Sequence, residues 1–195
     1  MAMTVKSFAA AIGFCLFAVG CRGSKAVEAV KQAGPPPVTA ATFEPVYRAA
    51  KSVQGATAAG VTYVTFGELL HGFSTEIDSA SDHPLNETEQ QLLAMYRQAF
   101  DDYQISADLW KKKLEAHQDY WKGEIPVSFD EAENQAALNT LAKYHIPVAD
   151  RKLYETQFKS VPSDAPQRIW RAADATLAKA TALLYGRPSD TPAAR

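Results

Sequence analysis

Residues 86–121 read NETEQQLLAMYRQAFDDYQISADLWKKKLEAHQDYW, and this stretch decides the fold class. Asn86, with Glu89 three residues later, has the spacing of a capping box at the start of a helix. Apolar residues then recur on one helical face: Leu92, Tyr96, Ala99, Tyr103, Trp110, Leu114 and Trp121. Gly123 and Pro126 stop the pattern, so the sequence predicts one long helix over about 87–121.

Four other segments have a helical period. The first starts with Thr42 as its cap and breaks near Gly60. The second covers about 62–81 and has a narrow apolar seam of Phe66, Leu70, Phe73, Ile77 and Ala80. A shorter helix opens with Ser128 and Glu131 and ends at Pro147. The last follows Asp164, has Pro166 in its first turn and closes at Gly186. Residues 148–161 are ambiguous, with one or two helical turns expected and no strand.

These segments predict an all-α fold, an up-and-down bundle of four or five helices with a long central helix. At 195 residues the chain suits one core-forming domain, placed at 42–186. Residues 187–195 are expected to be a disordered tail.

The N-terminus has the layout of a secretory signal. One basic residue, Lys6, precedes an apolar run from Phe8 to Val19, and small residues follow. As a helix this run of about a dozen residues rises roughly 18 Å, short of the ~30 Å hydrocarbon core of a bilayer. The segment 1–20 is therefore predicted to be a signal peptide and not a transmembrane span.

The run ends in Ala18-Val19-Gly20-Cys21, which resembles the lipobox of bacterial lipoproteins, although Ala18 stands where that family most often has leucine. The resemblance implies that Cys21 is acylated and becomes the first mature residue. The other cysteine, Cys15, lies inside the signal, so the mature chain cannot form an internal disulfide. An ordinary signal peptide with an incidental Cys21 is the alternative. In family terms, Arg22 implies the periplasmic face of the outer membrane.

Residues 21–41 include Pro35-Pro36-Pro37 and are predicted to be a flexible tether. About 20 such residues have a root-mean-square reach near 25 Å. The helical domain is therefore expected to stand clear of the lipid headgroups.

No residue pattern predicts catalysis or a cofactor. The net charge of −2 gives no indication of nucleic-acid binding, and nucleophile elbows, phosphate loops and haem or zinc motifs do not occur. Glu68 and His71 have the Glu-x-x-His spacing of di-iron bundles, but there is no second copy. Both also fall on the solvent side of their helix, so no metal site is predicted. Asp101 and Asp102 are expected to be a solvated surface pair.

Six residues of the long helix are candidate ligand or partner contacts. Tyr103, Trp110 and Trp121 belong to an aromatic stripe, for which core packing is the alternative. His117 lies within about 40° of the same seam and could contact a ligand or accept a proton, with a hydrogen-bonded residue at the core edge as the alternative. Ile105 and Leu109 point roughly 160° and 120° away from the main seam, where an isolated helix should be polar. Either a further helix covers them or they form a docking patch.

The leading functional hypothesis is a non-catalytic envelope lipoprotein that binds a protein partner. The second is a lipid-anchored binding protein for an apolar or aromatic small molecule held in the aromatic stripe. The third is an enzyme with a site near His117.

Overall fold

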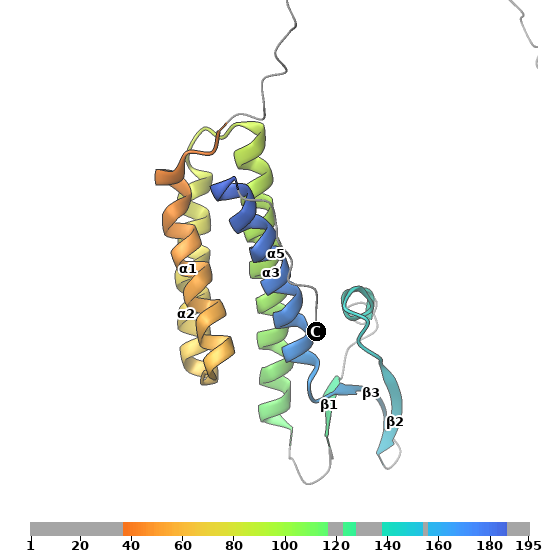
Figure 1. The fold of residues 1–195 in the computed structure, drawn as a ribbon. Helices are drawn as coiled ribbons and strands as arrows, with labels where there is room; N and C mark the ends of the chain where they lie inside the picture. The colour runs from red at the N-terminus through yellow and green to blue at the C-terminus, as the bar shows by residue number, and fades with distance from the viewer. Residues whose placement is uncertain (1–36, 117–122, 128–137, 154–155, 187–195) are drawn as a thin grey trace, which may run out of the picture. The chain divides into compact units, whose positions relative to one another are not determined.

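Four long helices make up most of the described chain: α1 (Ala40–Ala59), α2 (Tyr63–Ser81), α3 (Glu87–Glu115) and α5 (Ala165–Tyr185). The computed structural model describes residues 37–116, 123–127, 138–153 and 156–186. Figure 1 shows α1 beside α2 and α3 beside α5, with the beginning of α1 and the end of α5 at the same end. Residues 138–143 form a further short helical stretch.

Most helix boundaries follow the expected signals. The capping box at Asn86 is confirmed, since its side chain accepts from the backbone N–H of Glu89 and the Glu89 carboxylate accepts from that of Asn86. Gly186 ends α5 in the left-handed conformation, with φ 63°. The prediction that Thr42 caps α1 is wrong. Its N–H already bonds to the carbonyl of Thr39, which is the cap, so the helix begins three residues earlier than expected, at Ala40.

A three-stranded antiparallel sheet follows α3, so the all-α prediction is confirmed only in its coarser part. The chain is mostly helical, with strands β1 (Glu124–Val127), β2 (Ala149–Leu153) and β3 (Thr156–Pro162) in the order β1-β3-β2. The helical turns expected within 148–161 are therefore a β-hairpin. The strands escape a search for alternation because they are short, β1 contains a proline, and Ile125 pairs with Val161, far along the chain.

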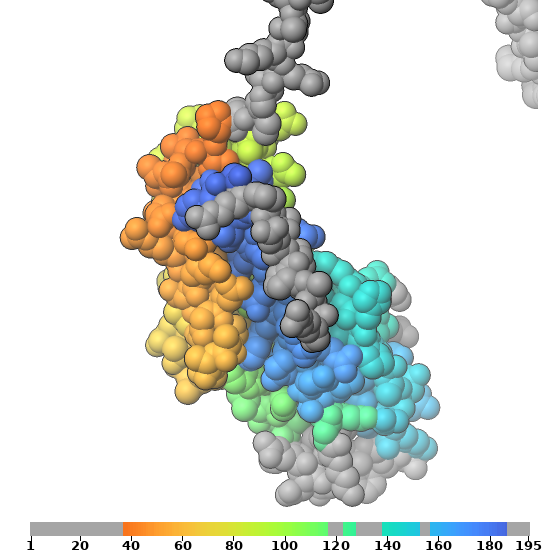
Figure 2. Space-filling view, viewed as in Figure 1, coloured from red at the N-terminus to blue at the C-terminus, as the bar shows by residue number. Residues whose placement is uncertain are grey.

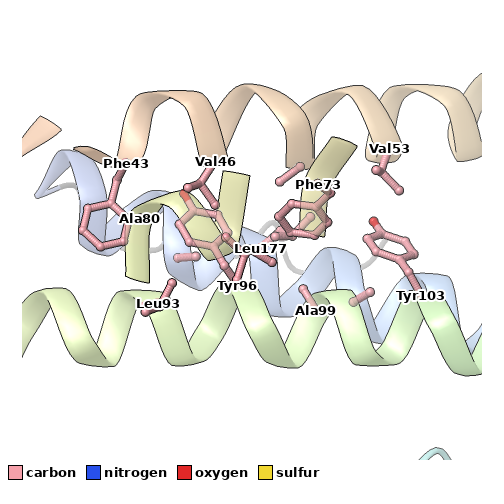
Figure 3. Packing of buried hydrophobic residues seen from close by; sticks show 14 of the residues in the cluster. Phe43, Val46, Val53, Phe73, Ala80, Leu93, Tyr96, Ala99, Tyr103 and Leu177 are labelled. Atoms are coloured by element: carbon pink, nitrogen blue, oxygen red, sulfur yellow. The ribbon is translucent and has the colours of Figure 1, made fainter. Parts of the chain in front are cut away.

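The first core lies between the four long helices (Figure 3). On α2 the predicted seam is confirmed, because all of its members are buried: Phe66, Leu70, Phe73, Ile77 and Ala80. On α3 the predicted seam is confirmed as far as Tyr103, with Leu92, Tyr96 and Ala99 also buried. Figure 3 shows Tyr96 and Tyr103 of α3 opposite Val46 and Val53 of α1.

A second core lies on another side of α3. Leu109 is 4% exposed within it, whereas the predicted seam residue Leu114 is 57% exposed, so the prediction for Leu114 is wrong. The members of this core are Leu109, Ile125, Val127, Leu141, Ile146, Val161, Ala165 and Ile169. In Figure 2 the surfaces of α1 (orange) and of the sheet region (cyan) lie on either side of α5 (blue). The end of α3 therefore faces two cores.

The stretch 138–143 ends in a Schellman motif. The N–H of Ile146 bonds to the carbonyl of Leu141, and the N–H of His145 bonds to that of Ala142. The motif requires a left-handed residue, and His145 takes that role at φ 53°. Leu141 and Ile146 then meet in the second core, as the hydrophobic contact of this motif predicts.

Several predictions fall outside the described residues: the signal peptide, Cys21, the tether up to residue 36, the continuation of α3 over 117–122, the capping box at Ser128 and Glu131, and the tail at 187–195. Within the described part of the chain, no helix combines the length and the apolar character needed to cross a bilayer.

Candidate functional site

The aromatic candidates on α3 lie in the first core. Tyr103 is fully buried, and its hydroxyl donates a hydrogen bond of 2.6 Å to Oδ1 of Asp174 on α5. Burial, and then this bond, raise the pKa of Tyr103 above its usual range. Trp110 is half-buried and makes an edge contact with Tyr63 of α2, their ring centroids 5.7 Å apart.

The aromatic rings pack against one another as core residues do. The rings of Phe66, Trp110 and Trp170 contact one another, with centroid distances of 5.9 Å (Phe66 to Trp110), 5.6 Å (Phe66 to Trp170) and 5.6 Å (Trp110 to Trp170). The indole N–H of Trp170 donates to the hydroxyl of Ser106 at 2.6 Å, so this buried donor is satisfied. Since these rings fill the space between the helices, their geometry fits core packing better than a ligand site.

Ile105 and Leu109 are covered. Leu109 is buried in the second core, and the half-buried Ile105 packs against it. The cover consists of the sheet, the start of α5 and the stretch 138–146, whereas the two alternatives from the sequence were one further helix or an open docking patch. His117 and Trp121 lie outside the described residues.

Asp102 is a buried carboxylate that the sequence analysis placed at the surface, so that prediction is wrong. It is 2% exposed, and its Oδ1 accepts hydrogen bonds from the Tyr144 hydroxyl, from Lys143 Nζ at 3.1 Å and from the Gln98 amide. Burial, and then the bond to Asp102, raise the pKa of the Tyr144 phenol. The bonds from Lys143 and Tyr144 hold residues 143–144 on α3, which gives the cluster a structural role.

Glu89 is a second buried carboxylate, in the first turn of α3. Its Oε1 accepts the N–H of Thr39 at 2.8 Å and its Oε2 that of Asn86 at 2.9 Å. The Asn86 amide also donates to the carbonyl of Pro37 at 3.3 Å. The bond from the Asn86 N–H is the main cause that lowers the pKa of Glu89. Glu89 and Asn86 therefore fix the point where the chain enters α1.

A groove of about 650 Å³ runs along the outer surface between α1 and α2. Small side chains line much of it: Ala41, Ala49 and Ser52 from α1 and Gly72 from α2. A Cβ added at Gly72 would meet no atom within 4 Å, so this glycine opens onto free space. Pro45 and Leu69 add apolar surface, so this groove is a concave feature of the described residues that could contact another molecule.

The charged residues of the groove are mostly acidic. Glu44 pairs with Arg48 at 3.0 Å and accepts the Tyr185 hydroxyl at 2.9 Å, and these two bonds lower its pKa. Glu68 and Glu76 have no ion-pair or hydrogen-bond partner among the described residues. The groove therefore carries two uncompensated carboxylates, both from α2.

The structure confirms that Glu68 and His71 are exposed. Across the described ranges, no group of three or more His, Cys, Asp or Glu residues is arranged to hold a metal ion. Sequence reasoning missed the groove because it depends on how two helices pack. The signal available was the run of small residues on the polar faces of both helices, with Glu68, Gly72 and Glu76 at four-residue spacing.

Comparisons with known proteins add no relative. The chain matches no protein-family model, no curated protein and no solved structure.

Proposed function

We propose that this protein is a non-catalytic envelope lipoprotein that binds a partner protein through the groove between α1 and α2. The observation that carries the proposal is the groove itself, with small side chains along it and the unpartnered carboxylates of Glu68 and Glu76. Because its lining side chains are small, a segment of a partner protein could lie close to the backbones of α1 and α2 in this groove.

The scaffold we propose is an up-and-down bundle of α1, α2, α3 and α5. Support comes from the contacts: α1 packs on α2, α2 on α3, α3 on α5, and α5 on α1, around one shared core. The hydrogen bonds to the two buried carboxylates, Glu89 and Asp102, join distant segments to α3 and so support the fold. Such a bundle holds the groove rigid.

The anchor we propose is the acylated Cys21 of the lipobox-like segment, on the periplasmic face of the outer membrane. Residues 37–39 enter α1 at the end that Asn86 and Glu89 hold, and Ala41, at the same end, lines the groove. The groove therefore begins close to the point where the tether joins the domain and runs away from it along both helices.

Photo-crosslinking in intact cells tests the binding role. A photo-reactive amino acid is placed at Ser52, in the groove, and in a second variant at Ala175, an exposed position on α5. The proposal expects a discrete protein adduct from position 52, lost when Gly72→Leu fills the groove, and none from position 175. Equal adduct patterns from both positions would contradict a groove-specific role.

Intact-mass analysis of the membrane-extracted protein tests the anchor. The wild type should begin at residue 21 with added acyl mass, and Cys21→Ser should leave the membrane fraction or keep its signal. A mature chain without lipid would contradict the anchor but leave the groove prediction standing.

A further inference from the structure

The two unpartnered glutamates of the groove lie at a spacing that another helix can match. Glu68 and Glu76 are eight residues apart on α2, about 12 Å along the helix axis. On a second helix, residues seven or eight positions apart also lie on one face, about 10–12 Å apart. Gly72 lies midway between the carboxylates and leaves open space there. A helix with two basic residues at that spacing could pair with both carboxylates at once.

The floor of the groove sets how close such a helix can come. Ala49 and Gly72 face it from opposite helices, with Ala41 at one end and Ser52 at the other. Ala41 and Ser52 are eleven residues apart on α1, so the groove is about 16 Å long, or roughly three helical turns. Small side chains on both surfaces allow close approach of two backbones, with gains in packing contacts.

Charge argues against a second copy of this chain docking groove to groove. Each copy would bring Glu68 and Glu76 to the same place, and like charges at an interface cost binding free energy. Arg48 offers no compensation, because it already pairs with Glu44. The complementary occupant is therefore basic.

We infer that the groove takes a basic amphipathic α-helix of a partner protein. Its small residues lie over Gly72 and Ala49, and two Lys or Arg residues, seven or eight positions apart, pair with Glu68 and Glu76. This inference rests on the proposed function and names the chemistry of the partner for the same groove. It also predicts that binding weakens as salt screens the exposed ion pairs.

The test titrates the purified domain with three synthetic helical peptides of alanine-rich sequence and follows amide shifts by two-dimensional NMR. In the first peptide two lysines lie eight residues apart, in the second glutamates replace them, and in the third glutamines. The inference expects the lysine peptide to shift the amides of Ala49 and Gly72 and to bind at least about tenfold more tightly than the glutamine peptide, a ratio that is about 1.4 kcal/mol. The glutamate peptide should not bind.

Matched variants on α2 test whether the lysine peptide binds in the groove. Gly72→Leu and the double change Glu68→Gln with Glu76→Gln should each weaken binding of the lysine peptide on the order of tenfold. Gly67→Leu and Asp78→Asn are the controls, because both residues are exposed on the same helix, outside the groove, and Gly67 also opens onto free space. Both glycine variants should fold, since leucine is the better helix former at either position.

Two outcomes would overturn the inference: equal binding of the lysine and glutamine peptides, or lysine-peptide binding that Gly72→Leu leaves unchanged. If either is found while the crosslink at position 52 persists, the groove is a docking site for a partner of other chemistry. Loss of the crosslink as well would remove the proposed function itself.

Discussion

The hydroxyl of Tyr144 donates a hydrogen bond to Oδ1 of Asp102, although the two residues lie 42 positions apart. Through this bond the Schellman turn at 141–146 is fixed to the middle of α3, with Lys143 as a second donor to the same oxygen. The contact joins the second core to the helices by a polar link. It also explains why a charged residue of α3 can be 2% exposed.

Tyr144→Phe should lower the free energy of unfolding by about 1–3 kcal/mol, because a buried carboxylate loses one of its donors. Urea denaturation followed by far-UV circular dichroism measures this loss. Tyr63→Phe is the control, since the hydroxyl of this half-buried tyrosine makes no hydrogen bond to any described residue. This change should alter stability by less than about 0.5 kcal/mol. Equal effects of the two changes would show that the Asp102 link contributes nothing.

Tyr96→Phe should raise the free energy of unfolding, in contrast to Tyr144→Phe. The Tyr96 hydroxyl is buried in the first core, points toward α1 (Figure 3) and has no hydrogen-bond partner in the part of the chain that the structure describes. Removing an unsatisfied buried hydroxyl while keeping the ring is expected to raise stability by about 1 kcal/mol. The same urea titration decides it. A loss of stability would mean that the hydroxyl has a partner, such as a buried water.

His145→Gly should stabilise the domain by about 1 kcal/mol, because only glycine adopts a positive φ without steric cost. His145→Ala keeps the Cβ and the strain, so it should give no such gain. Thermal unfolding of the two variants separates the backbone effect from loss of the imidazole. If alanine stabilises as much as glycine, the left-handed conformation is not the cause.

Signals that act within a few residues predicted the helices well. The seam of α2, the capping box at Asn86 and the glycine stop at Gly186 all depend on neighbours along the chain. The sheet depends on pairing between distant segments, such as Ile125 with Val161, and its short strands leave no periodic signal. Burial of Asp102 and the groove at Gly72 likewise arise only once segments are packed together.

The burial of two leucines near the end of α3 could not be predicted from the helical period of the sequence. Leu109 is buried between α3 and the sheet, and Leu114 is 57% exposed, although the predicted seam includes Leu114 and not Leu109. Leu109→Ala should therefore cost about 2–5 kcal/mol of stability. Leu114→Ala should cost less than about 0.5 kcal/mol. Chemical denaturation of both variants checks this order, and a reversed order would contradict the second core.

The ion pair that crosses the sheet should make stability depend on acidity. Glu124 accepts hydrogen bonds from Arg151 and from Ser160, and these lower its pKa from the usual 4.5 to about 2. Because the folded state favours the ionised carboxylate, the pair contributes stability above pH ~4.5, and this contribution is lost as the pH falls toward about 2. The carboxylate is 30% exposed, so the contribution is at most about 1 kcal/mol.

Denaturation midpoints of the wild type and Glu124→Gln test this dependence. The wild type should be the more stable at about pH 7, and the difference should shrink as the pH falls from about 4.5 to about 2, where the wild-type carboxyl becomes protonated. Lys159 and Asp150 pair on the same sheet at 2.7 Å, but this pair has an aspartate that is 86% exposed. Asp150→Asn is therefore the matched control, with a smaller effect at every pH. If the stability difference between the wild type and Glu124→Gln stays constant over this pH range, the stabilising contacts of Glu124 do not depend on its charge.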